Sequence, residues 1–426
     1  MKPFGSQLRW GLIFYLFLIS TMSYLDRVNL SIAGPTVQKE FGLTNVQLGY
    51  VFSALVWGYA LFQTAGGRMA DRFGPRWVLT LGILWWSGFT ALTAAVPAGI
   101  AGALFLLIAV RFVLGAGEAV MFPASNRLVA SWIPTTERGI ANGIVFGGVG
   151  AGLVLAPPLI NWIISNWGWR WSFFIRVPVG IVVALLWYWL ARDSPQQHPW
   201  TTKKELDRIE AGIPATKKDK GPAKPASWGT IFGTRPILFV TASYFAFGYT
   251  AWIFFTWFYK YLKDVRGLDL KASTFYTMLP GVGMALCSPL GGWISDILTK
   301  RFGKRVGRCG IGVVGLAGAS LFITIGALSE SAQMASIFLA CGIGSLYLAQ
   351  SSYWAVTADI AGPSAGSVSG LMNMGGQVAG AITAILTPWI AQEYGWTASF
   401  LTPAVLCAMG AIAWLMVDPT VHLESE

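Results

Sequence analysis

Four ionisable residues lie deep inside long apolar runs of the sequence, and their types suggest anion and proton chemistry. Asp26 and Arg27 are neighbours in one run, and Arg111 and Glu118 lie seven residues apart in another. A guanidinium group offers a planar fork of donors that matches a carboxylate. Burial favours the protonated form of a carboxyl group, so Asp26 and Glu118 could exchange protons when a bound anion takes one arginine. The four residues could thus couple carboxylate binding to proton binding.

The geometry of a helix limits which of these charges can meet. Adjacent residues point about 100° apart, so Asp26 and Arg27 must face different neighbours. Arg111 and Glu118 share one helix face but are about two turns apart, too far for an easy direct ion pair. Each charge costs about 2.5–3.5 kcal/mol at the centre of a membrane helix, so each must face the bundle interior or pair with another helix. A simpler alternative is two internal ion pairs that only hold the helices together.

The composition identifies the surroundings of these helices. Of 426 residues, 54% are hydrophobic and only 12% are charged, whereas soluble domains carry about 25% charged residues. So few charges cannot cover a water-soluble surface, and we expect lipid around most of the chain. The net charge of +11 comes from basic residues in a few short loops, which is typical of membrane orientation rather than nucleic-acid binding. The four cysteines are scattered and both histidines lie in polar segments, so we expect neither a metal site nor a histidine relay.

Apolar runs long enough to cross a membrane recur along the whole chain. Their expected bounds are 9–33, 46–67, 77–97, 101–123, 139–163, 171–191, 236–259, 273–295, 309–328, 332–356, 366–389 and 398–417. We predict an all-α membrane protein with twelve transmembrane helices in two pseudo-symmetric six-helix bundles. The bundles would be residues 1–191 and 236–426, joined by a polar linker, 192–235. Prolines argue against continuous structure in the linker, although 201–211 could form a short surface helix.

Lysine and arginine are distributed unevenly among the connections between these runs. The even-numbered connections carry most of them, and the third and ninth carry none. Positively charged loops remain in the cytoplasm. We therefore predict that both termini are cytoplasmic and that the protein resides in a bacterial inner (plasma) membrane.

The two halves of the sequence are related to each other. FGLTNVQLGY (41–50) aligns with RGLDLKASTF (266–275) at an offset of 225, and GWRWSFF (168–174) aligns with GWTASFL (395–401) at an offset of 227. The first offset also carries Gly67 onto Gly292 and Asp71 onto Asp296. A duplicated six-helix unit is typical of a carrier that works by alternating access.

GGRMADRFGPR (66–76) resembles the G-x-x-x-D-R-x-G pattern that follows the second helix in the major facilitator superfamily. A degenerate copy, GGWISDILTKRFGKR (291–305), follows the eighth run. Asp71 could pair with basic groups and cap a helix N-terminus across the cytoplasmic face. The alternative is that the motif is only a topology signal. The resemblance implies a cytoplasmic gate made of Gly67, Asp71, Arg72, Gly74, Arg76, Gly292 and Asp296.

Four further segments together resemble the anion:cation symporter family of that superfamily. They are SYLDRVNLSIA (23–33), RFVLGAGEA (111–119), SYWAVTADI (352–360) and GLMNMGGQ (370–377). The resemblance implies that Arg27 binds a substrate carboxylate, that Asp26 and Glu118 carry protons, and that Arg111 holds a partner carboxylate. It places Tyr24, Tyr59, Ser351, Trp354 and Asn373 around substrate hydroxyls, although each alone is as compatible with helix packing.

These observations predict a proton-coupled symporter that imports small organic anions, most simply sugar acids such as hexonates, hexuronates or aldarates. We expect a monomer with protons as coupling ion, no cofactor and no nucleic-acid partner. The deep charges would lie only in the first half, with Asp359 as a loop or cap residue. One alternative is an importer of aromatic or short dicarboxylic acids, and another is a proton-driven metabolite exporter. A membrane enzyme would need a nucleophile, metal cluster or histidine-based acid–base set, and the sequence shows none.

Overall fold

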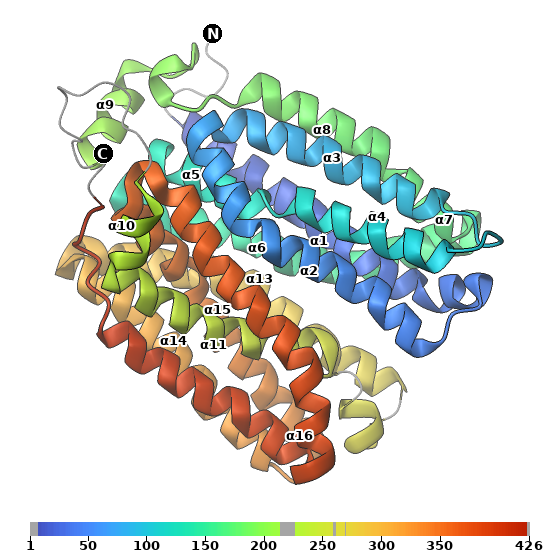
Figure 1. Ribbon diagram of the computed structural model, residues 1–426. Helices are drawn as coiled ribbons and strands as arrows, with labels where there is room; N and C mark the ends of the chain where they lie inside the picture. Colours follow the sequence, from blue (N-terminus) through green and yellow to red (C-terminus); the bar gives the residue numbers. More distant parts are fainter. Residues whose placement is uncertain (1–6, 214–225, 259–260, 269, 424–426) are drawn as a thin grey trace.

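The computed structural model describes residues 7–213, 226–258, 261–268 and 270–423, and within these ranges it contains helices and no strand (Figure 1). The longer of these helices form the two bundles, and short ones interrupt or connect them. The first half comprises α1 (Leu8–Phe41), α2 (Asn45–Phe73), α3 (Pro75–Ala95), α4 (Ala103–Glu118), α5 (Met121–Trp132), α6 (Arg138–Trp167), α7 (Trp169–Phe174) and α8 (Arg176–Leu190). The second half comprises α11 (Arg235–Thr256), α13 (Leu270–Lys304), α14 (Ile311–Leu328), α15 (Ala332–Ala361) and α16 (Ala365–Leu415).

Eight helical stretches in the described residues are long and apolar enough to cross a membrane. Two of them contain several crossings: Met278–Leu328 includes α14 and most of α13, and Ala332–Leu415 includes α15 and α16. α16 turns back at Gly395, whose φ of +85° is a conformation that suits glycine. With α2 added, the predicted twelve-crossing architecture is confirmed.

Several helices extend beyond their predicted ends because polar residues can continue a helix outside the hydrocarbon layer. α1 continues to Phe41 instead of ending at residue 33, and α2 continues to Phe73 instead of residue 67. The predicted fourth run ends at residue 123, whereas α4 and α5 together reach Trp132. The hydropathy of a run therefore predicts which residues lie in lipid, but it does not predict where the helix ends.

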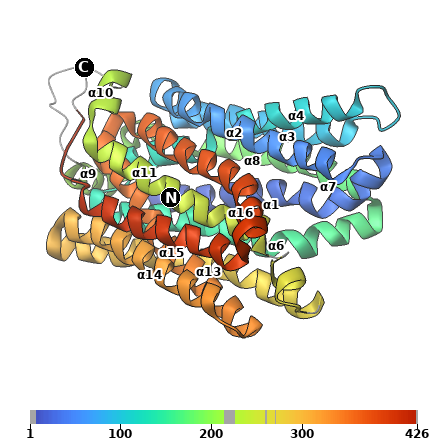
Figure 2. The same cartoon turned by 60° about the horizontal axis from the view of Figure 1, so that its bottom comes forward.

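The two halves form separate groups of helices whose main contacts with each other run along two helix pairs, with smaller contacts of α5 and α6 to α15 and α16 (Figure 2). α2 packs against α16, and α6 packs against α13. The halves lie close together at the end of the bundle that carries α9 (Lys203–Gly212) and α10 (Trp228–Gly233), and they diverge toward the other end (Figure 1). We call these ends the linker face and the distal face.

The segment between the halves is docked on the linker face. α9 confirms the short helix predicted for 201–211. Its Glu205 accepts hydrogen bonds from the backbone N–H groups of Leu8 (3.3 Å) and Arg9 (3.0 Å), which lie in the first turn of α1, where N–H groups have no acceptor within the helix. Pro195 starts a short 3₁₀ turn, while Pro214, Pro222 and Pro225 lie outside the described residues.

His198 fastens the beginning of this segment to α8. Its Nε2 lies 2.8 Å from the Leu190 carbonyl oxygen, and its Nδ1 accepts a hydrogen bond of 3.1 Å from the Trp200 N–H. Only the neutral imidazole can donate from Nε2 and accept at Nδ1 at the same time. Burial lowers the pKa of His198 below its ordinary value, which is consistent with this neutral form.

Candidate functional site

A buried ion pair joins α1 to α4 in the middle of the first half. Arg27 Nε lies 3.2 Å from Glu118 Oε2. Ser23, one turn earlier on α1, donates its hydroxyl to the other carboxylate oxygen of Glu118. The side chain of Glu118 is 1% exposed and that of Arg27 is 11% exposed. These two predicted site residues therefore meet across helices, as the helix geometry requires.

Two tyrosine rings enclose the guanidinium of Arg27. Its Cζ atom lies 5.0 Å from the ring centroid of Tyr24 and 3.9 Å from that of Tyr59. Both rings are in the range where a cation is attracted to an aromatic face. The Nη2 atom of Arg27 is buried and has no hydrogen-bond partner in the described part of the chain. Arg27 can therefore offer hydrogen bonds to an anion that approaches beside Glu118.

Asp26 forms a second buried ion pair, with a residue that the sequence analysis missed. Arg176, the first residue of α8, donates from Nη1 to Asp26 Oδ1. The claim of only four deep charges was therefore wrong, because Arg176 is a fifth. Arg176 lies inside the predicted sixth run, 171–191, so the sequence contained the information needed to identify it as a buried charge.

Arg111 is buried without an ion-pair partner among the described residues. It is 3% exposed, and its Nε atom has no hydrogen-bond partner there. No carboxylate in the described residues lies within ion-pair distance of its guanidinium. The structure thus pairs Glu118 with Arg27 and Asp26 with Arg176, and it does not show Arg111 holding a carboxylate.

The second half contributes neutral polar groups near Arg27. Asn373 of α16 donates from Nδ2 to Gln63 Oε1 (3.0 Å) and, more weakly, to the Tyr59 hydroxyl (3.5 Å). Ser351 of α15 is fully buried, and its hydroxyl has no partner in the described residues. Tyr59 therefore links the arginine of the first half to an amide of the second half.

Trp354 lies in an aromatic cluster between the halves. Its ring centroid is 4.8 Å from that of Phe146 and 5.8 Å from that of Phe122, both in the first half. Phe122 in turn contacts Tyr24, at 6.4 Å between centroids. The indole N–H of Trp354 is buried without a partner in the described residues, so the cluster presents one free donor.

The first copy of the sequence motif joins α2 to the start of α16 at the linker face. Asp71 accepts hydrogen bonds from Gly366 N (2.9 Å), Ser367 N (2.7 Å) and Ser367 Oγ (2.6 Å). These N–H groups are free donors at a helix N-terminus, where a carboxylate is also favoured by the helix dipole. A Cβ atom at Gly67 would lie 2.6 Å from the Gly366 carbonyl carbon, so only glycine permits this approach. We call this contact the first clasp.

The second copy makes the same contact between α13 and the start of α6. Asp296 accepts hydrogen bonds from Gly139 N (2.9 Å) and Ile140 N (2.7 Å). A Cβ atom at Gly292 would lie 2.9 Å from Ile140 N. The helix N-terminal cap expected of Asp71 is therefore present, and Asp296 makes a second one; in both cases the capped helix belongs to the other half. We call this contact the second clasp.

Three residues of the predicted gate make contacts inside the first half instead. Arg76 donates from Nε to the Tyr188 carbonyl oxygen (2.8 Å) and from its backbone N–H to Asp193 (2.9 Å). Gly74, with φ of +86°, forms the turn between α2 and α3. Arg72 lies with its guanidinium 5.6 Å from the Phe73 ring. These residues shape the turn and do not touch the second half in the contacts described.

A third contact between the halves at the linker face was not predicted. Asp359, expected to be a loop or cap residue, is buried and accepts a hydrogen bond of 2.7 Å from Arg138 Nη1. Arg308 Nε lies 3.6 Å from Asp359, and Arg308 Nη1 lies 2.6 Å from Asp296. Both arginines lie in basic connections, whose charge predicted only the orientation in the membrane.

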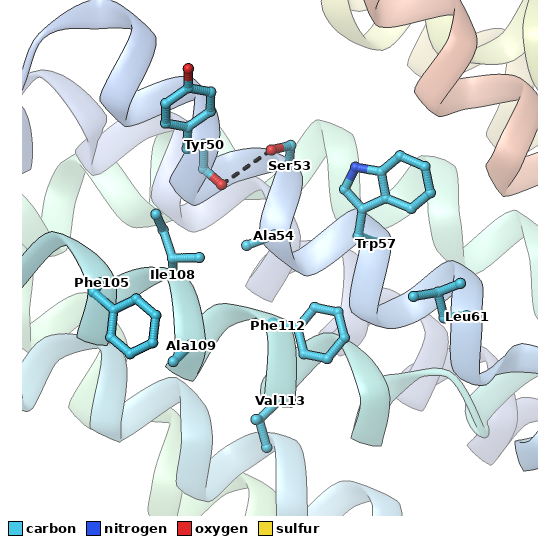
Figure 3. Close-up of a pocket in the computed structure, with 10 residues that line it drawn as sticks. All are labelled: Tyr50, Ser53, Ala54, Trp57, Leu61, Phe105, Ile108, Ala109, Phe112 and Val113. Carbon is cyan, nitrogen blue, oxygen red and sulfur yellow. Dashed lines mark hydrogen bonds between the residues drawn. The ribbon is translucent and has the colours of Figure 1, made fainter.

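A groove on the outside of α2 and α4 is lined by apolar side chains and lies away from these charges (Figure 3). Tyr50 and Trp57 of α2 and Phe105 of α4 are exposed there. Such a surface is suited to lipid, and it contains none of the charged residues of the site. In the described residues, no group of three or more histidine, cysteine or acidic side chains could hold a metal ion.

Comparison with known proteins identifies the family. The model of the Major Facilitator Superfamily matches residues 16–384. A probable sulfoacetate transporter of Cupriavidus necator is 36% identical over 410 residues, which are 96% of this chain and 93% of that protein. A probable galactarate/D-glucarate transporter of Bacillus subtilis is 32% identical over 98% of this chain and 92% of that protein.

A solved structure shows the same fold at low sequence identity. The proton:xylose symporter XylE, bound to 6-bromo-6-deoxy-D-glucose, superimposes with a TM-score of 0.74 and 16% identity over 98% of both chains. The two bundles, the repeated clasps and the family match lead to one conclusion: this chain belongs to the Major Facilitator Superfamily and is a membrane transporter, not an enzyme.

Proposed function

We propose that this transporter imports small organic anions together with protons, with sugar acids as the main substrate class. The observation that carries the proposal is Arg27, which is buried, paired with a single carboxylate and still has an unused donor. Curated relatives are named as transporters of sulfoacetate and of galactarate or D-glucarate, all of them organic anions.

Anion binding would be coupled to protonation through the partner of Arg27. A substrate carboxylate that takes the guanidinium competes with Glu118 for the same positive charge. Glu118 is nearly fully buried, so losing its cation strongly favours its protonated form. The hydroxyl of Ser23 can remain hydrogen-bonded to Glu118 in either form. One anion and one proton would then occupy the site together.

Neutral groups of the second half would bind the rest of the substrate. Asn373, Ser351 and the indole N–H of Trp354 lie on α15 and α16, and the last two have no partner in the described residues. A sugar acid carries hydroxyl groups that can donate to and accept from such side chains. Closure of the two halves around the substrate would bring these groups against the anion held by Arg27.

The linker face would be the cytoplasmic face of a bacterial inner membrane. The even-numbered connections and the segment between the halves bring most of the Lys and Arg residues to this end. In the structure both clasps are formed there, while the halves diverge toward the distal face. This arrangement corresponds to a transporter that is closed on the cytoplasmic side and can receive substrate from outside. We propose that it acts as a monomer with both termini in the cytoplasm.

A short dianion is the second candidate substrate, and the aromatic cluster favours it. Trp354, Phe122 and Phe146 pack between the halves close to Tyr24, which leaves less polar surface for a chain of hydroxyl groups. The relative from Cupriavidus necator is named for sulfoacetate, a substrate without hydroxyls on its carbons. Buried arginines would serve such a compact anion as well as a sugar acid.

Uptake into proteoliposomes that contain the purified protein tests this function. D-glucarate, D-galactonate and sulfoacetate would be supplied with and without an inward proton gradient, and we expect the gradient to drive accumulation of at least one. Arg27→Ala should abolish uptake, whereas Arg170→Gln, at a partly exposed arginine paired with Glu40 away from the site, should retain it. Uptake that ignores the gradient would refute proton coupling, and normal uptake by Arg27→Ala would refute the anion site.

A further inference from the structure

We propose that Gln350 and Gln377 are specificity-determining residues that select organic acids with hydroxyl groups over acids of the same charge without them. The proposal rests on organic-anion uptake as the function and deepens it, because it names the feature of the substrate that the second half recognises. The family resemblance implies no role for either glutamine.

Gln350 of α15 is buried with its amide oxygen unused. The residue is 2% exposed, and its Nε2 donates to the Tyr244 hydroxyl of α11 at 3.2 Å. This bond uses the nitrogen end of the amide, and Oε1 has no hydrogen-bond partner in the described part of the chain. A buried carbonyl oxygen without a donor costs free energy. A donor that arrives with the substrate would remove that cost.

Gln377 repeats this arrangement on α16. Its Nε2 donates to Asn373 Oδ1 at 3.5 Å, and its buried Oε1 has no partner among the residues described. Asn373 in turn donates to Gln63 Oε1 and to the Tyr59 hydroxyl. The Tyr59 ring covers the guanidinium of Arg27, so Gln377 is connected to the anion site through one amide and one ring. Two helices of the second half thus present the same unused group, an amide oxygen.

The helix face of Gln350 is directed toward the first half. Trp354 and Thr357, four and seven positions later, lie on the same face of α15. Trp354 packs against Phe146 of the first half. Thr357 accepts a hydrogen bond of 3.0 Å from Asn126 Nδ2, also in the first half. Gln350 lies one turn farther from the linker face than Trp354, toward the end at which the halves diverge (Figure 1).

The unused groups of the two halves require different partners. In the first half, Arg27 Nη2 and Gln63 Nε2 are free donors in the described structure, and they suit the oxygens of a carboxylate. In the second half, the free oxygens of Gln350 and Gln377 can only accept. A carboxylate or sulfonate oxygen also only accepts, so it cannot bind to them, whereas a hydroxyl group can donate. The acid that satisfies both sides carries hydroxyl groups along its carbon chain, as D-glucarate does and sulfoacetate does not.

Uptake by the wild-type protein in proteoliposomes tests this selection with acids of matched charge. D-glucarate and adipate are dicarboxylates of equal chain length that differ only in their hydroxyl groups. D-galactonate and sulfoacetate complete the panel. Each unpaired amide oxygen should reduce kcat/KM about 10-fold. We therefore expect the two hydroxylated acids to be taken up with kcat/KM about 100-fold above adipate and sulfoacetate.

Gln350→Met and Gln377→Met remove the free oxygen and keep the approximate length of the side chain. Each variant should lower kcat/KM for D-glucarate about 10-fold and leave that for adipate unchanged or higher. Gln196→Met, at an exposed glutamine between the two bundles in sequence, is the matched control and should change neither value. Variants at Gln350 and Gln377 that lower uptake of D-glucarate and adipate by the same factor would overturn the proposal, because the glutamines would then act only in packing.

The wild-type panel decides the question even if neither variant folds. Equal uptake of D-glucarate and adipate, or a preference for the acids without hydroxyl groups, would overturn hydroxyl selection and leave organic-anion uptake in place. Absence of uptake of every acid in the panel would refute the proposed function, and this inference with it.

Discussion

The first clasp can be broken by adding one methyl group. In Gly67→Ala, the new Cβ would lie 2.6 Å from the Gly366 carbonyl carbon and closer still to the Gly366 carbonyl oxygen, whereas ordinary contacts begin at 3.4 Å. The obstacle is backbone and cannot rotate away, so α2 and α16 must separate by at least about 0.8 Å. Gly49→Ala is a matched control in the same helix, because a Cβ there has nothing within 4 Å.

The free energy that Gly67→Ala removes from the closed state follows from the hydrogen bonds of Asp71. A separation of about 0.8 Å lengthens the bond to Gly366 N from 2.9 Å to about 3.7 Å, beyond hydrogen-bonding range. The bonds to Ser367 weaken in the same way. Each bond to a charged group contributes about 1.5–3 kcal/mol, but water can replace part of it once the face opens. We expect a loss of about 1–3 kcal/mol from the closed state, or about 5–150-fold in the closed-to-open ratio.

Hydrogen exchange at two amides reports this shift directly. Gly366 N–H and Ser367 N–H both donate to Asp71 and should be protected while the clasp is closed. In Gly67→Ala they should exchange about 5–150-fold faster than in Gly49→Ala, and uptake should slow because the closed state is depopulated. Equal protection of these amides in the two variants would refute the assignment of this contact as a gate.

Two further predictions concern the segment docked on the linker face. Glu205→Gln should lower the stability of the folded protein by about 1–3 kcal/mol, because two backbone donors at the start of α1 lose a charged acceptor; thermal unfolding checks this, with the exposed Glu210→Gln as control. Burial lowers the pKa of His198, so the unfolded state binds the proton more tightly than the folded state. The contribution of His198 to the stability of the folded protein is therefore complete above about pH 6.5 and is lost as the pH falls toward the folded-state pKa. Limited proteolysis between Leu190 and Trp200 should accelerate on acidification, and a His198→Gln variant that still shows the same pH dependence would contradict this.

The clasps and α9 could be predicted because their signals are local or repeated. Asp71 and Asp296 stand at the same distance from a glycine in both halves, and a carboxylate four residues after a small residue suits a close helix crossing that ends in a cap. The α9 helix begins at Lys203 and is capped by Thr202, whose hydroxyl accepts from the Glu205 N–H, a common N-terminal signal. The identity of the capped helices needed the structure, because they lie in the other half of the chain.

The pairing of the buried charges could not be predicted, because it depends on which helices become neighbours. Helix geometry predicts that Asp26 and Arg27 face different neighbours. It cannot predict that α8 brings Arg176 to Asp26 and that α4 brings Glu118 to Arg27. Arg176 was overlooked because it stands near the start of its apolar run, where a basic residue is usually explained by the membrane surface. The aromatic cluster around Trp354 likewise joins residues more than 200 positions apart in the sequence.

The reciprocity of the two clasps bears on how such a molecule could arise. Asp71 and Asp296 are related by an offset of 225, and the helix starts that they cap, at Gly366 and Gly139, are related by an offset of 227. Each half thus supplies one acid and one helix end. In a symmetric pair of identical six-helix subunits, one glycine and one aspartate in each subunit would create both contacts across the two-fold axis. The two acids differ in their arginine neighbours: Arg127 Nε lies 3.6 Å from Asp71, and Arg308 Nη1 lies 2.6 Å from Asp296.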